Sequence, residues 1–306
     1  TLSAGAGPVN IYDNIIQANL ANDDGGGIRF LMAGNFVYNV YNNFIVNNVS
    51  THEGGGISLN DAPNVRVYNN TIMKNITTAT AVTSTGAPAP AGLSTSLNSD
   101  LLQATLPANS PYFSNPVLFN NIFWDNRAGS WNGAGIAGIG LEGDPNPKNF
   151  WDMGVADSAS LRVQPTYSII SSTLGYVPDA SNLVGVNPLI QAAYDTSVSA
   201  LPWRTNPHFV GVLLVAVDLP PNLMGDYHLQ TDGVVSPAIN AGTASVVVNG
   251  ARVRAPSRDI DSDLRPSDGG YEIGADETGP YSGFLNVLPG TAADLLTVVY
   301  LPVIHK

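Results

Sequence analysis

The sequence predicts an all-β fold: a parallel β-helix (β-solenoid) with a loop inserted among its coils and a β region that caps its C-terminal side. A block repeats in the first half of the chain at intervals of 29 and then 27 residues, and a period of roughly 20 to 50 residues is typical of solenoids, propellers and arrays. Short runs rich in β-branched and aromatic residues lie between punctuating Asn and Gly residues, which indicates strands. No stretch has the 3.6-residue apolar period of a helix.

Each copy of the repeat contains two asparagines five residues apart. The runs around them are so short that they predict about three strands for each coil. Asn tolerates the left-handed backbone conformation of a sharp turn, so we expect these residues at the corners of the coils. Stacked coils would align their side chains in hydrogen-bonded ladders; a polar ladder that faces a ligand is the alternative. The pairs are Asn14 and Asn19, Asn43 and Asn48, Asn70 and Asn75, and Asn121 and Asn126.

A glycine triplet follows the asparagines in each of the first two copies and indicates a tight corner where backbone packs closely. Asp23, Asp24 and Glu53 directly precede the triplets. If they stack at one corner, two of them could bind Ca²⁺ or act as acid and base in glycoside hydrolysis. A solvated corner is the alternative, and we expect the neighbouring His52 to be exposed rather than catalytic.

Residues 77–116 interrupt the repeat. The step from Asn70 to Asn121 is 51 residues, which is one coil plus an excursion of roughly 24 residues, or two coils of which one is degraded. The segment begins with a Thr/Ser/Pro-rich stretch typical of O-glycosylated stalks, although an ordinary surface loop also explains it. The candidate glycosylation sites are Thr77, Thr78, Thr80, Thr83, Ser84 and Thr85.

Five motifs occur in order in the second half of the chain: Asn187-Pro-Leu-Ile190, Gly225-Asp-Tyr-His-Leu229, Ser236-Pro-Ala-Ile-Asn-Ala-Gly242, Asp259-Ile-Asp-Ser-Asp-Leu-Arg-Pro266 and Gly270-Tyr-Glu-Ile-Gly-Ala-Asp-Glu277. With the Asn/Gly coils at 9–136, this region resembles the C-terminal region of bacterial secreted right-handed parallel β-helix repeat proteins, a surface- or anchor-associated group. The resemblance implies right-handed coils and export, but no particular reaction. The excursions at 77–116 and 191–224 depart from the group.

These observations divide the chain into three parts. Coils are expected over 1–190, a closing β region over 191–278 and a tail strand over 279–306. The tail contains the most apolar segment of the chain, at 295–304, which could cap the solenoid, pair with a neighbouring subunit or serve in export.

One further motif suggests a metal site. Asp259, Asp261 and Asp263 place carboxylates at alternating positions and are candidate ligands for a loop-type Ca²⁺ site, with help from Asp276 or Glu277. An EF-hand is excluded, because its sixth and twelfth positions need Gly and Glu and this run has Leu and Gly there. Arginines on both sides could pair with the acids instead. We expect no other cofactor.

Composition excludes several classes of protein. The net charge is −12, whereas nucleic-acid binders need a basic surface, and the apolar content of 44% is too high for a disordered chain. No run of 18 apolar residues exists, so no membrane span is expected. The absence of Cys excludes disulfides and a cysteine nucleophile. The polar positions are filled by Asn, Ser and Thr, as on exported proteins, which favours an extracellular or cell-surface location.

The first coil begins within nine residues of the N-terminus. Open solenoid ends expose unpaired strand edges, so we expect either a proteolytic start at Thr1 or another copy stacked there. The leading hypothesis is a secreted, non-enzymatic structural surface protein that self-associates as a homo-oligomer or filament and carries glycans on its inserted loop. One alternative is a polysaccharide lyase or glycoside hydrolase acting on an extended polysaccharide, and a second is a glycan-binding adhesin.

Overall fold

The computed structural model describes residues 5–279 except 134, 141–143, 145, 203–212, 219–224 and 268. Nearly all regular structure in these residues is β, and the one α-helix among them is four residues long. They include no helix with the length and apolar character needed to cross a membrane. Except for its first residue, the tail expected over 279–306 lies outside the described residues.

Each of the first four coils contributes four strands rather than the three expected. The first has β1 (Val9–Tyr12), β2 (Ile15–Gln17), β3 (Leu20–Ala21) and β4 (Ile28–Leu31); the second has β5 (Tyr38–Tyr41), β6 (Phe44–Val46), β7 (Val49–Ser50) and β8 (Ile57–Asn60). The third has β9 (Val65–Tyr68), β10 (Thr71–Met73), β11 (Ile76–Thr77) and β12 (Leu93–Thr95); the fourth has β13 (Val117–Phe119), β14 (Ile122–Trp124), β15 (Arg127–Ala128) and β18 (Met153–Val155). The sequence missed a strand because the third strand of each coil has only two residues, too few to show an alternating pattern.

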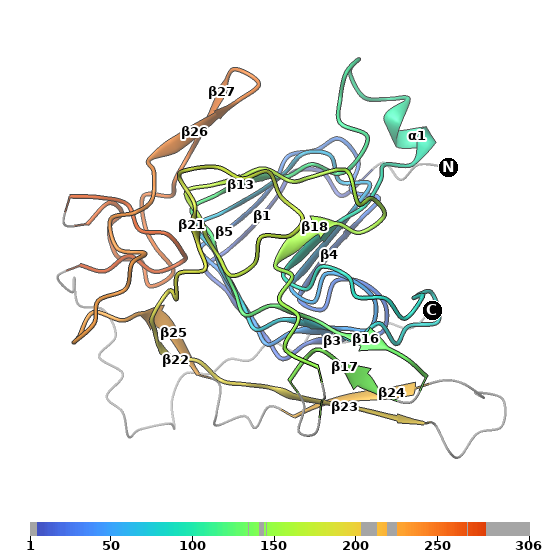
Figure 1. Ribbon diagram of the computed structural model, residues 1–306. Helices are drawn as coiled ribbons and strands as arrows, with labels where there is room; N and C mark the ends of the chain where they lie inside the picture. The colour runs from blue at the N-terminus through green and yellow to red at the C-terminus, as the bar shows by residue number, and fades with distance from the viewer. Residues whose placement is uncertain are drawn as a thin grey trace.

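Equivalent strands of successive coils pair in parallel and form four sheets (Figure 1). Three shorter strands extend two of them: β19 (Pro165–Thr166), β20 (Ile169–Ile170) and β21 (Leu183–Val184). We name the sheets A (β1-β5-β9-β13-β19), B (β2-β6-β10-β14-β20-β21), C (β3-β7-β11-β15) and D (β4-β8-β12-β18). Their register matches the sequence repeat: Ile11 lies opposite Val40, which lies opposite Val67. The stacked parallel strands make a repeat fold of the β-solenoid kind.

The core runs along the inside of the stack. Val40, Ile45, Val67 and Leu93 belong to one buried apolar cluster and have no exposed surface. The alternation seen at Val65 and Val67 places both residues in this cluster, as a period of two predicts. Burial of one such side chain stabilises the fold by about 2 kcal/mol. Because each coil contributes several of these side chains to the cluster, each coil adds to the stability of the core.

The insertion is one enlarged coil. β13 pairs directly with β9, with Leu118 opposite Val67, so no degraded coil lies between them. The extra residues form two loops, at 78–92 and 96–116, on either side of β12. The second loop contains helix α1 (Asp100–Gln103), whose N-cap Ser99 accepts a hydrogen bond from the Leu102 amide.

The C-terminal region packs against the side of the stack rather than over its end (Figure 1). Its antiparallel pairs are β22 (Ile190–Ala192) with β25 (Asp226–Leu229), β23 (Ser197–Pro202) with β24 (Leu213–Asp218), and the hairpin of β26 (Ser245–Val248) with β27 (Ala251–Arg254). A further pair, β16 (Ser130–Trp131) with β17 (Ile136–Ala137), lies within the fourth coil. Phe44 and Ile122, on two strands of sheet B, share an apolar cluster with Tyr227 and Ile273. The closing region thus covers a lateral face over several coils.

Candidate functional site

The eight paired asparagines form two ladders along the stack. In the first, the Nδ2 atoms of Asn14, Asn43 and Asn70 donate to the Oδ1 atoms of Asn43, Asn70 and Asn121 at 3.0, 2.9 and 3.1 Å. In the second, Asn19, Asn48 and Asn75 donate in the same way to Asn48, Asn75 and Asn126 at 2.9, 3.1 and 3.0 Å.

The amides of the ladders hold the backbone rather than face a ligand. Asn70 Nδ2 also donates to the carbonyl of Tyr68, at 3.0 Å, and to that of Val40 in the preceding coil, at 2.9 Å. All ladder asparagines from the second to the fourth coil are buried. Because every polar atom there has a partner inside the coil, the ladders are structural.

The left-handed residue at each corner is the one before the ladder asparagine, which corrects the expectation. Asn42, Asn69 and Asn120 have φ of 51°, 51° and 53°. Their side chains point away from the coil and hydrogen-bond the C-terminal region: Asn42 donates to the Arg258 carbonyl at 2.7 Å, and Asn120 to that of Thr243 at 2.8 Å.

The second ladder ends on a buried acid. Asp152 Oδ1 accepts from Asn126 Nδ2 at 2.8 Å, and its Oδ2 accepts from the amides of Ser171 and Ser172 at 2.7 and 3.0 Å. Burial raises the pKa of Asp152 to about 6, against the opposing effect of these hydrogen bonds. No signal in the sequence set this residue apart.

The acids before the glycine triplets do gather at one corner, beside sheet D. Asp24 lies between two partners: Arg29 Nη2 is 2.7 Å from its Oδ2, and His52 Nδ1 is 2.7 Å from its Oδ1. His52 is half-buried, contrary to the expectation that it is exposed, and its hydrogen bond with Asp24 raises its pKa. Burial and the nearby charge of Asp24 raise the pKa of Glu53 to about 7.

This corner has side chains that could bind a metal ion, but it also contains the positively charged side chain of Arg29. Ligand atoms of Asp23, Asp24 and His52 lie within 4.8 Å of one another. The guanidinium of Arg29 already contacts both aspartates, with Nη1 3.5 Å from Asp23 and Nη2 2.7 Å from Asp24. The cluster is therefore charge-compensated by side chains of the chain itself.

The three aspartates proposed as Ca²⁺ ligands do not converge on one point. Asp259 turns inward: its Oδ1 accepts from the amides of Asp261 and Asp263 at 3.0 and 2.7 Å, and its Oδ2 from that of Glu277 at 2.9 Å. It thus stabilises its own turn. Burial raises its pKa to about 6.

Asp261 instead joins a different group, with His228 and Asp276, whose ligand atoms lie within 4.8 Å of one another. His228 bridges two acids, with Nδ1 2.5 Å from Asp226 and Nε2 2.7 Å from Asp261. Burial opposes protonation, but these hydrogen bonds outweigh it and raise the pKa of His228 to about 11. A metal ion would have to displace that proton, so the protonated His228 supplies the positive charge of this group.

The candidate glycosylation sites differ in their exposure. Thr77 and Thr78 are buried, and Thr80 and Ser84 are partly buried. Thr83 and Thr85 are exposed, and the Thr83 hydroxyl donates to Asp23 Oδ1 at 2.8 Å.

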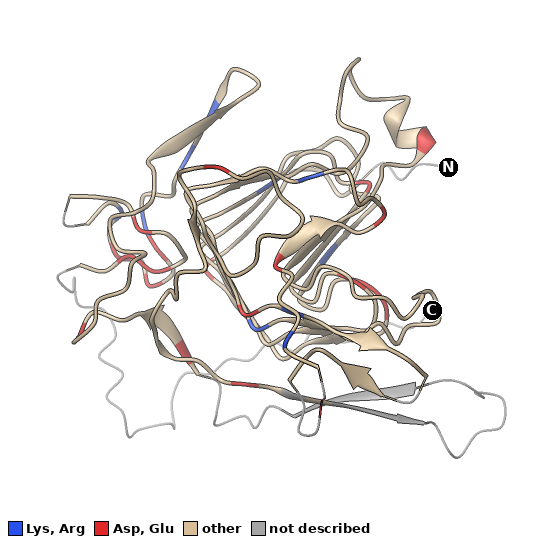
Figure 2. Ribbon diagram, in the orientation of Figure 1, with Lys and Arg blue, Asp and Glu red and all other residues tan. Residues whose placement is uncertain are grey.

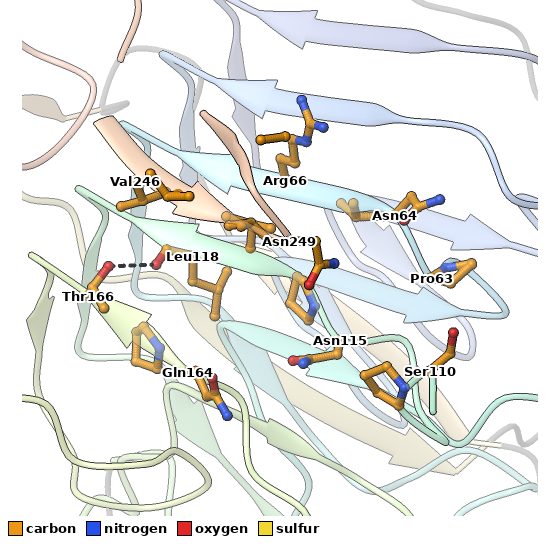
Figure 3. A pocket seen from close by; sticks show the side chains of 18 of the residues that line it. Pro63, Asn64, Arg66, Ser110, Asn115, Leu118, Gln164, Thr166, Val246 and Asn249 are labelled. Atoms are coloured by element: carbon orange, nitrogen blue, oxygen red, sulfur yellow. Dashed lines mark hydrogen bonds between the residues drawn. The ribbon is translucent and has the colours of Figure 1, made fainter. Parts of the chain in front are cut away.

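A groove of about 1030 Å³ lies on the outer face of sheet A (Figure 3). Its floor is formed by β9, β13 and β19, one wall by the loop at 106–116 and the other by the β26–β27 hairpin. The hairpin is held over the sheet by an apolar cluster that joins Val253 to Tyr68 and Phe119.

Amides, prolines and valines dominate the lining of the groove. Asn64 Nδ2 donates to Asn35 Oδ1 at its edge. The Oδ1 atom of Asn115 is shielded from solvent and accepts no hydrogen bond in the described residues. Arg66 is the one Lys or Arg among the described lining residues, and Asp179 is the one acid. Charged residues are sparse over the coils as a whole (Figure 2).

A row of stacked rings lies beside the groove on the same face. Tyr12, Tyr41, Tyr68 and Phe119 stack in succession, with ring centroids 5.0, 5.3 and 5.1 Å apart. Phe119 is fully buried and Tyr12 is 49% exposed, because the hairpin covers only one end of the row. Burial raises the pKa of Tyr68 to about 12.

Sequence reasoning did not identify the groove. Its walls come from the loop at 106–116 and from the β26–β27 hairpin, and the sequence predicts no functional residue in either. The sequence does contain a signal for one wall. Asn249-Gly250 lies between a run of valines at 246–248 and the alternating arginine, valine and arginine at 252–254, and such a pair is typical of a tight hairpin. Asn249 and Gly250 both have positive φ, 50° and 77°.

Comparison of the chain with protein-family models, with curated proteins and with solved structures gave no match.

Proposed function

We propose that this chain is a non-enzymatic β-solenoid that binds a segment of an extended polysaccharide in the groove over sheet A. The observation that carries the proposal is the lining of the groove, where side-chain amides stand beside apolar surfaces in a cleft of about 1030 Å³. Binding sites combine apolar walls with a few oriented polar groups. An extracellular location, as expected from the composition, fits such a ligand.

The polar groups suit hydroxyl-rich ligands. An amide side chain both donates and accepts hydrogen bonds, as each sugar hydroxyl does. Asn64 and Gln164 are exposed on the lining, where their amides can reach the hydroxyls of a ligand. Pro63, Pro111 and Pro178 line the groove and are at least partly exposed, so they offer flat apolar contacts for the C–H faces of a sugar ring.

The small number of carboxylates in the groove lining favours binding over hydrolysis. Most glycoside hydrolases use two carboxyl groups on either side of the scissile bond. Among the described lining residues, Asp179 is the one carboxylate. The charge-compensated corner at Asp24 belongs to sheet D and contributes no residue to the groove lining.

The test is binding of the purified protein to a panel of soluble polysaccharides by calorimetry, with parallel assays for released reducing ends and unsaturated products. We expect binding without product. Asn64→Ala combined with Gln164→Ala should weaken binding about thirtyfold, since each lost hydrogen bond contributes about 1 kcal/mol. The matched control is Asn146→Ala, an exposed amide outside the groove, which should bind as the wild type does. Release of product, or no binding to any polysaccharide, would refute the proposal.

A second candidate function is self-association through the edge of the first coil. The outermost strands β1 to β4 of the described stack carry Tyr12, Ile15, Leu20 and Leu31, which are 43 to 60% exposed. Unpaired edges of this kind are templates for pairing with another chain, and we propose a second copy as the partner.

Sedimentation and electron microscopy over a wide concentration range test this self-association. Ile15→Lys should abolish assembly, and dispersed wild-type monomers at every concentration would contradict it.

We also infer that the coils are right-handed, because connections between parallel strands of one sheet are right-handed in nearly all proteins. A crystal structure with left-handed coils would overturn this inference.

A further inference from the structure

The groove contains a positive charge that the chain does not neutralise. Arg66 lies on β9, in register with Asn39 on one side and Val117 on the other. It is partly buried and lines the groove. Figure 3 draws it on the strand that crosses the groove, between Val246 of the hairpin and Asn64. Within the described residues its guanidinium makes no hydrogen bond or ion pair, whereas Arg29, Arg127 and Arg265 all pair with acids.

The acid in the groove lining is directed elsewhere. Asp179 Oδ1 accepts from the amide and the hydroxyl of Ser181, at 2.9 and 2.5 Å. These hydrogen bonds lower the pKa of Asp179, and they hold its carboxylate against its own turn. The charge of Arg66 is therefore available to a ligand.

The net charge of −12 does not prevent an anionic ligand from binding. At physiological ionic strength, exposed charges more than about 8 Å apart are largely screened. The local field in the groove is then set by its own lining, where Arg66 faces amides and apolar residues. A guanidinium presents a rigid planar fork of donors that matches a carboxylate in two parallel hydrogen bonds.

We propose that the ligand of the groove is a uronate-bearing polysaccharide, with Arg66 binding a carboxylate while the amides bind the hydroxyls. This inference rests on the proposed function and specifies its ligand class. Arg66 then determines the preference for acidic over neutral glycans.

The experiment compares polygalacturonate with its fully methyl-esterified form, which has the same backbone without the charge. Calorimetry in the presence of EDTA removes bridging by Ca²⁺. We expect the wild type to bind the acid form at least tenfold more tightly than the ester, because hydrogen bonds to charged groups are the strong ones. Arg66→Gln should abolish that preference, and the control Asn146→Ala, outside the groove, should keep the wild-type preference for the acid form. Arg66→Lys should retain part of it, since it keeps the charge and loses the fork.

Circular dichroism of each variant checks that the coils still form. If the wild type binds acid and ester equally, the inference is overturned and the proposed function stands. If a sulfated polysaccharide binds as tightly as the uronate, the site recognises negative charge alone, and the assignment to uronates is overturned. If no glycan binds in any form, the proposed function itself fails.

Discussion

At the scale of single residues, the repeat predicted the asparagine ladders but not which residue adopts the left-handed turn. The spacing of the paired asparagines predicted ladders at coil corners, and Asn43 and Asn70 lie in such a ladder. The left-handed turn fell on the preceding residue instead. The reason is geometric: the ladder side chain must reach back to the carbonyl two residues earlier, as Asn70 does to Tyr68, and the preceding residue absorbs the turn. Lys74 and Asp125, with φ of 57° and 53°, show that this position does not require Asn.

Replacing Asn70 with alanine should destabilise the fold by about 3 kcal/mol. The change removes the ladder bonds with Asn43 and Asn121 and leaves buried carbonyls without donors, each at a cost of about 1 to 3 kcal/mol. The free energy of unfolding in urea measures the effect. Asn14→Ala, at the exposed end of the same ladder, is the control and should cost under about 1 kcal/mol. A loss below about 1 kcal/mol for Asn70→Ala would show that the ladder contributes little.

The ring stack gives a second comparison between a buried and an exposed end. Phe119→Ala should cost about 4 kcal/mol, because its ring is fully buried against Tyr68 and under Val253. Tyr12→Ala, at the exposed end of the row, should change stability by less than about 1 kcal/mol. Thermal and urea unfolding of both variants tests this, and a large loss for Tyr12→Ala would show that the row acts as a unit.

At the scale of elements, longer strands and tight corners were predictable and short or inserted elements were not. β9 shows a two-residue period, and Gly54 has φ of +61° at the expected corner. β3 has only two residues and no period to read. Helix α1 has four residues and is placed by the insertion that surrounds it, since a single turn has little intrinsic stability.

The contacts between the coils and the C-terminal region can be tested separately from the coils. Asn120 donates to the Thr243 carbonyl and accepts from its amide at 2.9 Å. Asn120→Gly keeps the left-handed turn, which suits glycine, and removes both bonds. We expect amide hydrogens in 225–279 to exchange about tenfold faster or more, while those of β5 and β9 keep their protection. Uniform acceleration over the whole chain would instead indicate one cooperative unit.

At the scale of the whole molecule, the groove could not be predicted because no local pattern encodes it. Arg66, Asn115, Thr166 and Asn249 come from a strand, an insertion, a later coil and a hairpin. Stacking brings the first three together, and lateral packing of the C-terminal region adds the fourth. Asp23 and Asp24 could be predicted from the sequence because they precede a glycine corner that recurs in the next coil. A sequence period does reveal corners that repeat from coil to coil.

The whole molecule should be most stable in mildly acidic solution. Burial raises the pKa of Glu53 to about 7, of Asp152 and Asp259 to about 6, and of Glu272 to about 9. A carboxyl group whose pKa is higher in the folded than in the unfolded chain stabilises the fold fully below its unfolded pKa, and this contribution disappears as the pH rises through the folded pKa. His228 acts in the same direction, since its pKa of about 11 makes its contribution fall between about pH 6.5 and 11.

Acids whose pKa is lowered in the folded chain determine how stability falls at low pH. Arg127 and Lys74 outweigh the effect of burial and lower the pKa of Asp125, so its contribution is lost as the pH falls below its unfolded value of about 3.8. The free energy of unfolding, measured in urea at a series of pH values, should therefore peak near about pH 4 to 5 and decline toward pH 9. Asp152→Asn should remove about 3 kcal/mol of that decline, mostly between about pH 4 and 6, because its pKa shift spans about two units. A stability that rises from pH 5 to 8 would contradict this account, because it would require the buried acids to be more readily ionised in the folded chain than in the unfolded one.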